Sequence, residues 1–262
     1  MPTHTVNGVN LCYEVTGTGP SLLFLHGLGS SLRDWELQVA EFARDYQVIT
    51  FDLRGHGQSG KPRGPYTMEM LATDAAELLR ALGIARAHVV GLSLGGGVAF
   101  QLAVAYPQLV RSLVVVNSTP DAEIRTLQQR LMVATRFALI RFLGFRRFGK
   151  ILAKNLLPEP ELAEVRATFL ERYAENDRTG YLAAMRAFLG WSVLTRIGGI
   201  TCPTLILAAD NDYFPTAQKE AYVALIPGAE LVVVPDSRHA LPVERPQEFN
   251  AALRLFLDAQ PR

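Results

Sequence analysis

A serine set between glycines is the first group in this sequence that could act as a nucleophile. The pentapeptide at residues 91–95 reads GLSLG, with Ser93 at its centre, after the apolar pair Val89-Val90 and before a helical pattern at 98–105. This order predicts a tight turn from a strand into a helix, which holds a serine hydroxyl clear of its surroundings. A packing serine in a small-residue turn is the alternative. The glycines at 95–97, each unfavourable in a helix by about 1 kcal/mol, favour a close approach of helix and sheet and hence the nucleophile.

A serine hydroxyl needs a base that takes its proton, and the base needs an acid that orients it. His239 follows the last predicted strand, in the polar stretch that begins at residue 235. We predict that it is the base, because ligand chemistry belongs to loops at the carboxyl end of such a sheet. The other histidines lie in a terminal segment, at the start of a strand or within other motifs; they are His4, His88, His26 and His56.

Two aspartates compete for the role of the acid. Asp210 and Asp212 both follow the predicted strand 204–209, again at a carboxyl end, whereas Asp52 and Asp236 are weaker alternatives. We favour Asp212. The order along the chain is then serine, aspartate, histidine, which is the order expected for a serine on a strand-to-helix turn and differs from that of other serine-hydrolase folds.

The pattern of the whole chain indicates an α/β fold with a mostly parallel sheet covered by helices on both faces. The predicted strands are 9–15, 21–26, 46–52, 88–92, 112–117, 204–209 and 230–234, and the predicted helices are 33–44, 67–82, 94–106, 216–225 and 246–257. From 120 to 199, helical periodicity continues without a convincing strand, with breaks at Gly144, Pro158, Pro160, Gly180 and Gly190. We therefore predict a core of residues 1–119 and 200–262 and an inserted helical cap at 120–199.

Several separated motifs together resemble the α/β-hydrolases, and in particular their small capped esterases, enol-lactonases and carbon-carbon bond hydrolases. The motifs are FLHGLG at 24–29, DLRGHGQS at 52–59, the GLSLG turn, the strand from Pro203 toward Asp212, and Arg238-His239 ahead of Pro246. The resemblance covers nearly the whole chain and implies an eight-stranded sheet with an inserted cap. Arg238 and the pair Ala208-Ala209 stand where glycine is frequent in the family, departures that bear on loop shape.

The resemblance also implies roles for individual residues. In this family the acid lies nine residues after the proline that opens its strand, which points to Asp212 and leaves Asp210 as a neighbour that caps the turn. Two backbone N–H groups must receive the charge that develops on the substrate oxygen, and the family pattern places them at Leu28 and Leu94. His26 then shapes its loop and is not a base. Neither a metal nor a cofactor is implied.

The loop GHGQSG at 55–60 also matches the G-x-G-x-x-G pattern of a dinucleotide site. The residues that follow, KPRGP at 61–65, contain two prolines and a glycine. They cannot open the helix whose N-terminus would hold a pyrophosphate. We therefore interpret residues 55–60 as a structural loop.

The predicted cap is strongly basic in its first half. Residues 121–157 contain eight Lys and Arg residues against Asp121 and Glu123, with apolar side chains between the charges. Such a stretch could touch anionic lipid or admit an acidic substrate. We expect instead a lid helix that buries its apolar face over the pocket while its charges face water. Trp191 and Phe188, late in the cap, are candidates for binding the substrate, with ordinary packing as the alternative.

Composition excludes several classes of protein. The 262 residues carry a formal net charge of +1, so no overall basic excess exists to hold nucleic acid. No apolar run approaches the roughly 18 residues of a membrane span, and the start lacks the pattern of a secretory signal, so we predict a cytoplasmic protein. Cys12 and Cys202 have no neighbour at metal-ligand spacing and are interpreted as small buried side chains. No pattern defines the oligomeric state.

These features predict a serine hydrolase that cleaves a carboxylic ester through an acyl-enzyme intermediate, without metal or cofactor. The apolar cap favours a small or medium uncharged acyl group. A lactonase, or a carbon-carbon bond hydrolase of a ring-fission product, would use the same residues. A ligand receptor with a vestigial triad and cofactor-free oxygen chemistry are alternatives from other classes.

Overall fold

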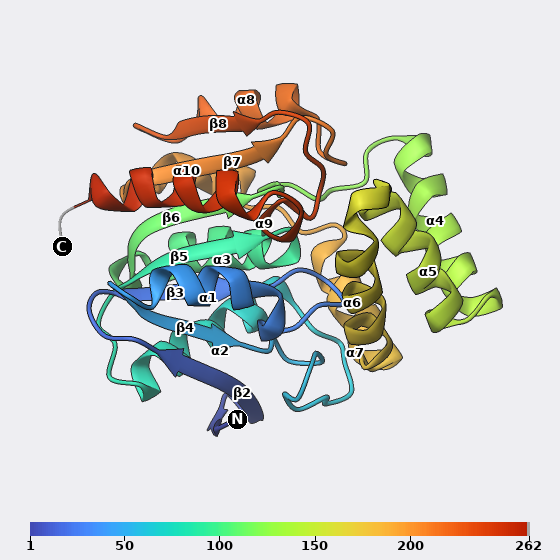
Figure 1. Cartoon of the computed structure of the whole chain (residues 1–262), viewed down its shortest axis with the longest axis horizontal. Coiled ribbons are helices and arrows are strands. Elements are labelled where there is room, and N and C mark those ends of the chain that lie inside the picture. Colours follow the sequence, from blue (N-terminus) through green and yellow to red (C-terminus); the bar gives the residue numbers. More distant parts are fainter. Residues whose placement is uncertain (261–262) are drawn as a thin grey trace.

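An eight-stranded sheet runs through the centre of the computed structural model, which describes residues 1–260 (Figure 1). The strand order is β1-β2-β4-β3-β5-β6-β7-β8. The strands are β1 (Thr3–Val6), β2 (Val9–Thr16), β3 (Ser21–Leu25), β4 (Gln47–Phe51), β5 (Ala87–Leu92), β6 (Val110–Val116), β7 (Thr204–Ala209) and β8 (Glu230–Val234). The prediction of an eight-stranded sheet is confirmed, and β1 is the strand that the sequence pattern did not single out.

Most of the sheet is parallel. β2 pairs antiparallel with both β1 and β4, and the other neighbouring strands, from β4–β3 through β7–β8, pair in parallel. Parallel strands bring their carboxyl ends to one edge. The loops after β3, β4, β5, β7 and β8 therefore gather there, and these are the loops that contain the predicted site residues.

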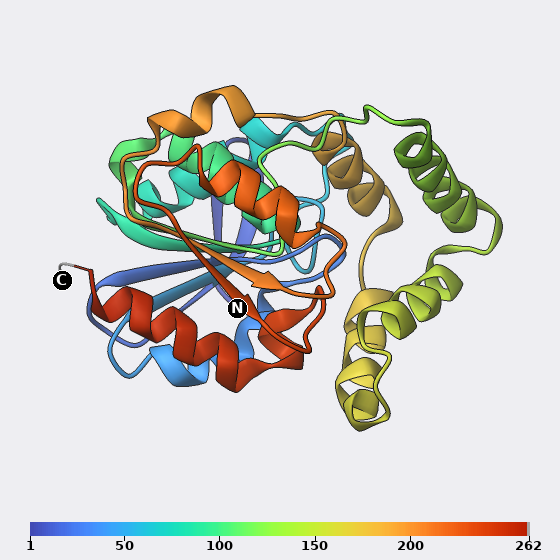
Figure 2. The ribbon, with the colours of Figure 1, turned by 90° about the horizontal axis from the view of Figure 1, so that it is seen from above.

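Helices cover both faces of the sheet, as predicted (Figure 2). One face packs on α1 (Glu36–Phe42) and α10 (Pro246–Asp258), where Trp35, Phe42 and Phe249 belong to one buried cluster. The other face packs on α2 (Met68–Ala81), α3 (Leu94–Ala105) and α8 (Thr216–Val223), which contribute to a second and larger cluster. The short α9 (Leu241–Glu244) precedes α10. Because both faces are covered, the parallel strands read as nearly continuous apolar runs.

Four helices occupy the chain between β6 and β7 and lie beyond one edge of the sheet (Figure 1). They are α4 (Leu127–Phe142), α5 (Phe145–Leu156), α6 (Ala163–Ala174) and α7 (Arg178–Phe188), and we call them the cap. Gly144 separates α4 from α5, and Pro158 and Pro160 separate α5 from α6. The expected break at Gly180 is wrong: this glycine lies inside α7, where a Cβ would collide with the carbonyl oxygen of Gly55.

The two ends of the predicted insertion lie side by side. Asp121 and Ser192 form an isolated antiparallel bridge, and the Ala122 N–H donates to the Trp191 carbonyl at 2.8 Å. The Val193 N–H donates in turn to the Pro120 carbonyl, also at 2.8 Å. The chain thus leaves and re-enters the core at neighbouring points. This supports an inserted cap; the paired segments are 120–122 and 191–193, and our division at 120–199 remains a proposal.

Candidate active site

Ser93 lies in the tight turn between β5 and α3. Its backbone has φ 55° and ψ −115°, a sparsely populated conformation for a residue with a side chain. A Cβ on Gly91 would collide with the Gly95 carbonyl, and one on Gly95 would collide with the Leu25 carbonyl on the adjacent strand. Glycine is therefore required at both positions, because α3 begins in direct contact with the sheet. This is the close approach that the run of glycines predicted.

Three side chains from separate loops meet at the carboxyl edge of the sheet. His239 Nε2 lies 2.9 Å from Ser93 Oγ, and His239 Nδ1 lies 2.5 Å from Asp212 Oδ1. An ionised carboxylate only accepts hydrogen bonds, so Nδ1 carries the proton and Nε2 is left free to accept one from the serine. The arrangement can therefore move a proton from the Ser93 hydroxyl to the imidazole.

Asp212 has a second charged partner that the sequence analysis missed. Lys219, on α8, places its Nζ 2.7 Å from Asp212 Oδ2, and both side chains are fully buried. Burial tends to raise the pKa of Asp212, but the hydrogen bond and charge of His239 and the charge of Lys219 outweigh it and hold that pKa below its usual value. Burial lowers the pKa of Lys219, against the opposing pull of Asp212. The only sequence signal was that Lys219 shares a helix face with Tyr222.

Asn117, also missed, connects the acid side of the site to the base. It follows β6 with φ 44°, and its Oδ1 accepts from Lys219 Nζ at 3.2 Å and from the Ala209 N–H at 2.8 Å. Its Nδ2 donates to the carbonyl oxygens of Arg238 and His239, at 3.0 and 3.1 Å. One buried amide thus fixes the backbone of His239 and the end of β7 together.

The alternative acid and the alternative bases have other partners. The carboxylate of Asp210 accepts the N–H groups of Asp236 and Ser237, both at 3.0 Å, so it caps that turn as expected. His88 Nδ1 lies 2.7 Å from Ser112 Oγ inside the sheet. His4 lies in β1, away from this edge.

His26 and Asp52 shape the loops beside the site. His26 Nε2 accepts the Leu53 N–H at 2.9 Å while Nδ1 lies 2.8 Å from the Gly27 carbonyl, and burial lowers the His26 pKa to about 4. Asp52 accepts the N–H groups of Leu32 and Gln58, at 2.8 and 2.7 Å. A Cβ on Gly57 would collide with that carboxylate, so the glycines of loop 55–60 serve its internal packing.

The two expected oxyanion donors lie on either side of the serine. Leu94 is the first residue of α3, where backbone N–H groups have no partner within the helix. The loop that contains Leu28 passes close by, since a Cβ on Gly27 would lie 3.7 Å from Ser93 Cβ. The oxyanion role of both amides stays a prediction.

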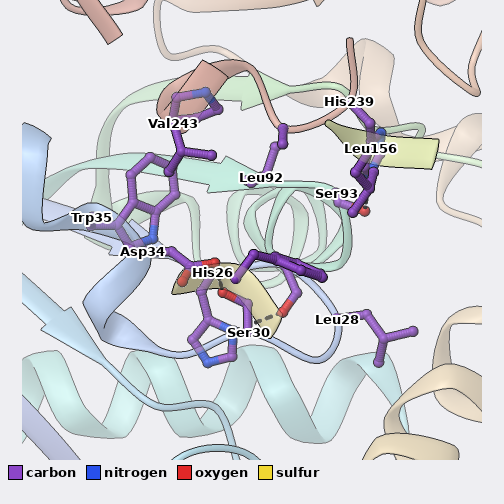
Figure 3. Close-up of a pocket in the computed structure, with 14 residues that line it drawn as sticks. His26, Leu28, Ser30, Asp34, Trp35, Leu92, Ser93, Leu156, His239 and Val243 are labelled. Carbon is purple, nitrogen blue, oxygen red and sulfur yellow. Dashed lines mark hydrogen bonds between the residues drawn. The ribbon is translucent and has the colours of Figure 1, made fainter. Parts of the chain in front are cut away.

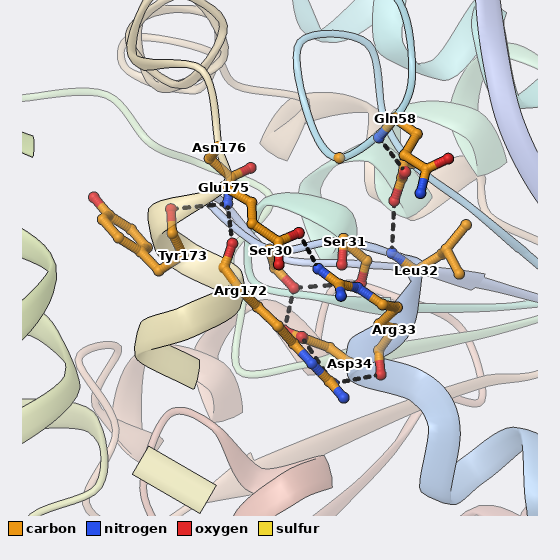
Figure 4. Close-up of polar contacts among 12 residues, drawn as sticks. Ser30, Ser31, Leu32, Arg33, Asp34, Gln58, Arg172, Tyr173, Glu175 and Asn176 are labelled. Carbon is orange, nitrogen blue, oxygen red and sulfur yellow. Dashed lines mark hydrogen bonds and ion pairs between the residues drawn. The ribbon is translucent and has the colours of Figure 1, made fainter. Parts of the chain in front are cut away.

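The cap holds this loop from the other side (Figure 4). Asn176 Nδ2 donates to the Gly29 carbonyl at 2.8 Å, and Arg172 Nη1 donates to the Arg33 carbonyl at 2.7 Å. Arg172 also pairs with both carboxylate oxygens of Glu36 at 2.8 Å. The cap and the candidate oxyanion loop therefore form one connected structure.

A cavity of about 70 Å³ opens beside Ser93 (Figure 3). Its walls are mainly apolar, and two of them, Leu156 and Phe169, come from the cap. Asp34 also lines the cavity; burial raises its pKa, while the hydrogen bond from Ser30 and the charge of Arg172 act in the opposite direction. Trp191 and Phe188 do not line this cavity: Trp191 Nε1 donates to Gln101 Oε1 at 2.9 Å, and Phe188 packs against Gly97. Their substrate-binding role stays a prediction without support from the cavity lining.

Comparison with known proteins identifies the family. Residues 20–246 match the family model described as the alpha/beta hydrolase fold, so the chain belongs to the α/β-hydrolase family. It is 30% identical to 3-oxoadipate enol-lactonase 2 of Acinetobacter baylyi, over 97% of this chain and 96% of the relative. RutD of Caulobacter segnis, a carbamate hydrolase by name, is 31% identical over 98% and 99% of the two chains. The structure of the enol-lactonase from Burkholderia xenovorans LB400 matches with a TM-score of 0.90 and 28% identity, covering 98% of this chain and 100% of that one.

Proposed function

We propose that the protein hydrolyses a carboxylic ester or lactone with Ser93 as nucleophile. His239 takes the serine proton as the hydroxyl attacks the carbonyl carbon, and the negative charge of Asp212 stabilises the imidazolium. The N–H groups of Leu28 and Leu94 receive the oxyanion. The imidazolium then protonates the leaving alcohol, and water, activated by the same histidine, releases the acid from the acyl-enzyme.

The observation that carries this proposal is the unbroken chain of hydrogen bonds from Ser93 Oγ through His239 to Asp212. Packing of the core alone does not require this arrangement. It combines a serine in a strained turn, a histidine whose Nε2 can accept the serine proton, and a buried carboxylate. Enol-lactonases among the relatives and structural neighbours support acyl chemistry at this site.

The cavity supports a short acyl group. Its volume of about 70 Å³ is well below the ~300 Å³ of pockets for drug-sized ligands. Its mainly apolar walls favour an uncharged group. A panel of p-nitrophenyl esters and lactones of increasing acyl length would decide between ester and lactone and locate the length at which kcat/KM falls.

The test of the nucleophile is Ser93→Ala, with Ser21→Ala at the opposite end of the sheet as the matched control. We expect Ser93→Ala to lower kcat for p-nitrophenyl acetate by about 10⁴-fold or more and to abolish labelling by a fluorophosphonate probe. Ser21→Ala should retain both. Full hydrolysis and labelling in Ser93→Ala would refute the assignment.

A cytoplasmic location belongs to the same proposal. It is supported by two cysteines that are both free, Cys12 and Cys202, as is usual where thiols are kept reduced. Fractionation of the native host cells would test it.

A further inference from the structure

The outer pair of cap helices, α4 and α5, concentrates positive charge. Residues 127–156 hold seven of the chain's 26 Lys and Arg residues and none of its 25 Asp and Glu residues, so the rest of the chain has nineteen basic residues against 25 acidic ones. Within residues 1–260, none of these seven side chains lies within ion-pair distance of a carboxylate. A nearly neutral protein therefore presents one strongly cationic end.

The same end exposes large apolar side chains. The inner face of α4 packs through Ile140 on a cap cluster that includes Phe148 and Tyr181. Its opposite face has an apolar stripe at helical spacing, with Leu127, Leu131 and Phe142 exposed at 72%, 59% and 80%. Ala138 lies on the same stripe and is also exposed. The expectation that the lid helix buries its apolar side chains is thus wrong for this face of α4.

A hollow of about 330 Å³ between α4 and α7 is lined by both cationic and apolar side chains. It is lined by the arginines 141, 178 and 186 together with Phe137, Phe142 and Leu182. The Arg186 guanidinium lies 5.2 Å from the centre of the Phe137 ring. Cationic heads next to apolar walls suit an amphiphile with a negative head group.

From these observations we propose that the outer face of α4 docks on an anionic lipid surface. Its apolar stripe enters the region between head groups and acyl chains, and Arg130 and Arg141 beside the stripe contact the lipid phosphates. Contact is peripheral, since no described helix is long and apolar enough to cross a membrane. In Figures 1 and 2, α4 lies at the end of the molecule away from the sheet, where a flat surface can reach it.

Two other occupants fit less well. A second copy of this face would bring Arg130 and Arg141 against the same two cations of the other copy. A nucleic acid would satisfy the cations but leaves the exposed leucines and phenylalanine unexplained, because its backbone offers no apolar surface. Anionic lipid satisfies both the charge and the apolar stripe.

The test uses the full chain carrying Ser93→Ala, so that lipid hydrolysis cannot interfere, and measures sedimentation with vesicles. We expect binding to vesicles of phosphatidylglycerol and phosphatidylcholine at physiological salt, and little binding to phosphatidylcholine alone. Leu131→Ser with Phe142→Ser should weaken binding by about tenfold or more, and Arg130→Gln with Arg141→Gln by on the order of twentyfold. The matched controls are Leu255→Ser, exposed at 78% on α10, and Arg44→Gln with Arg196→Gln, two exposed arginines outside α4 and α5. They should bind as the parent does.

Absent binding to anionic vesicles would overturn the proposal. Binding that the stripe variant leaves unchanged would also overturn it, because that result would indicate adsorption by charge alone. A stripe-dependent dimer in gel filtration without lipid binding would show that a second copy covers this face. Because vesicle sedimentation needs no turnover, failure here leaves the proposed hydrolysis untouched, and failure of hydrolysis leaves this result untouched.

Discussion

The protein contains two charged regions that differ in burial and pairing. Beside β7, the carboxylate of Asp212 is buried between His239 and Lys219, and each oxygen has a partner at 2.5 or 2.7 Å. On α4 and α5, six exposed cations and the half-buried Arg136 have no carboxylate in ion-pair range among the described residues. Buried charge must be paired, because desolvation is costly, and pairing fixes geometry. Unpaired exposed charge costs little, and it remains available to a partner.

The largest effect should come from breaking the paired region at its centre. Asp212→Asn keeps the shape of the side chain but removes the charge that stabilises the His239 imidazolium and its correct tautomer. We expect kcat to fall by about 10³–10⁴-fold. Asp210→Asn is the matched control, since that exposed carboxylate caps a turn; it should retain activity within a fewfold. If steady-state kinetics showed a large loss of kcat for Asp210→Asn and little loss for Asp212→Asn, Asp210 would be the acid.

Lys219→Met should sharpen the comparison, because it removes the buried cation and keeps the length of the side chain. Without this cation, the negative charge of Asp212 stabilises the imidazolium more strongly. The acid-side midpoint of the kcat/KM profile should rise by about one pH unit, and the free energy of unfolding should fall by about 3 kcal/mol. Both can be measured, by pH-rate profiles and by urea unfolding.

The other titratable groups near the imidazole are common to both proteins and cancel in the difference. They include Tyr213 and Tyr222, whose pKa values burial raises, and His26, with a pKa of about 4. Gln218→Met, one position earlier on the exposed side of α8, controls for the added methionine. If the free energy of unfolding falls but the acid-side midpoint of the kcat/KM profile does not move, Lys219 only balances the buried charge of Asp212 and does not tune the histidine.

The sequence predicted what local pattern and motif determine. β7 and β8 have the bounds that their apolar runs predicted, and Ser93, Asp212 and His239 meet where parallel strands end. β1 escaped because it is a short edge strand with three exposed residues out of four, so only its pairing with β2 defines it.

Long-range contacts account for the other differences. Residue 180 is a glycine although it lies inside a helix, because the backbone of Gly55, far away in sequence, occupies the space that a side chain would fill. Lys219 and Asn117 could not be assigned, since neither type of residue signals a buried partner about a hundred residues distant. The outer stripe of α4 was missed because helical spacing finds an apolar face but does not reveal whether anything covers it.

The smallest effect concerns the contact between the cap and the candidate oxyanion loop. Asn176→Ala removes the donor to the Gly29 carbonyl, next to Leu28, and leaves the chemistry of the triad intact. One such hydrogen bond is worth about 0.5–1.5 kcal/mol. We therefore expect kcat to fall by about fivefold if the bond holds the Leu28 amide in place, with KM nearly unchanged. Asn155→Ala, on the exposed side of α5, should be silent. A rise in KM at constant kcat would mean that the cap shapes the pocket and does not position the oxyanion donor, since a group that acts only on the transition state lowers kcat.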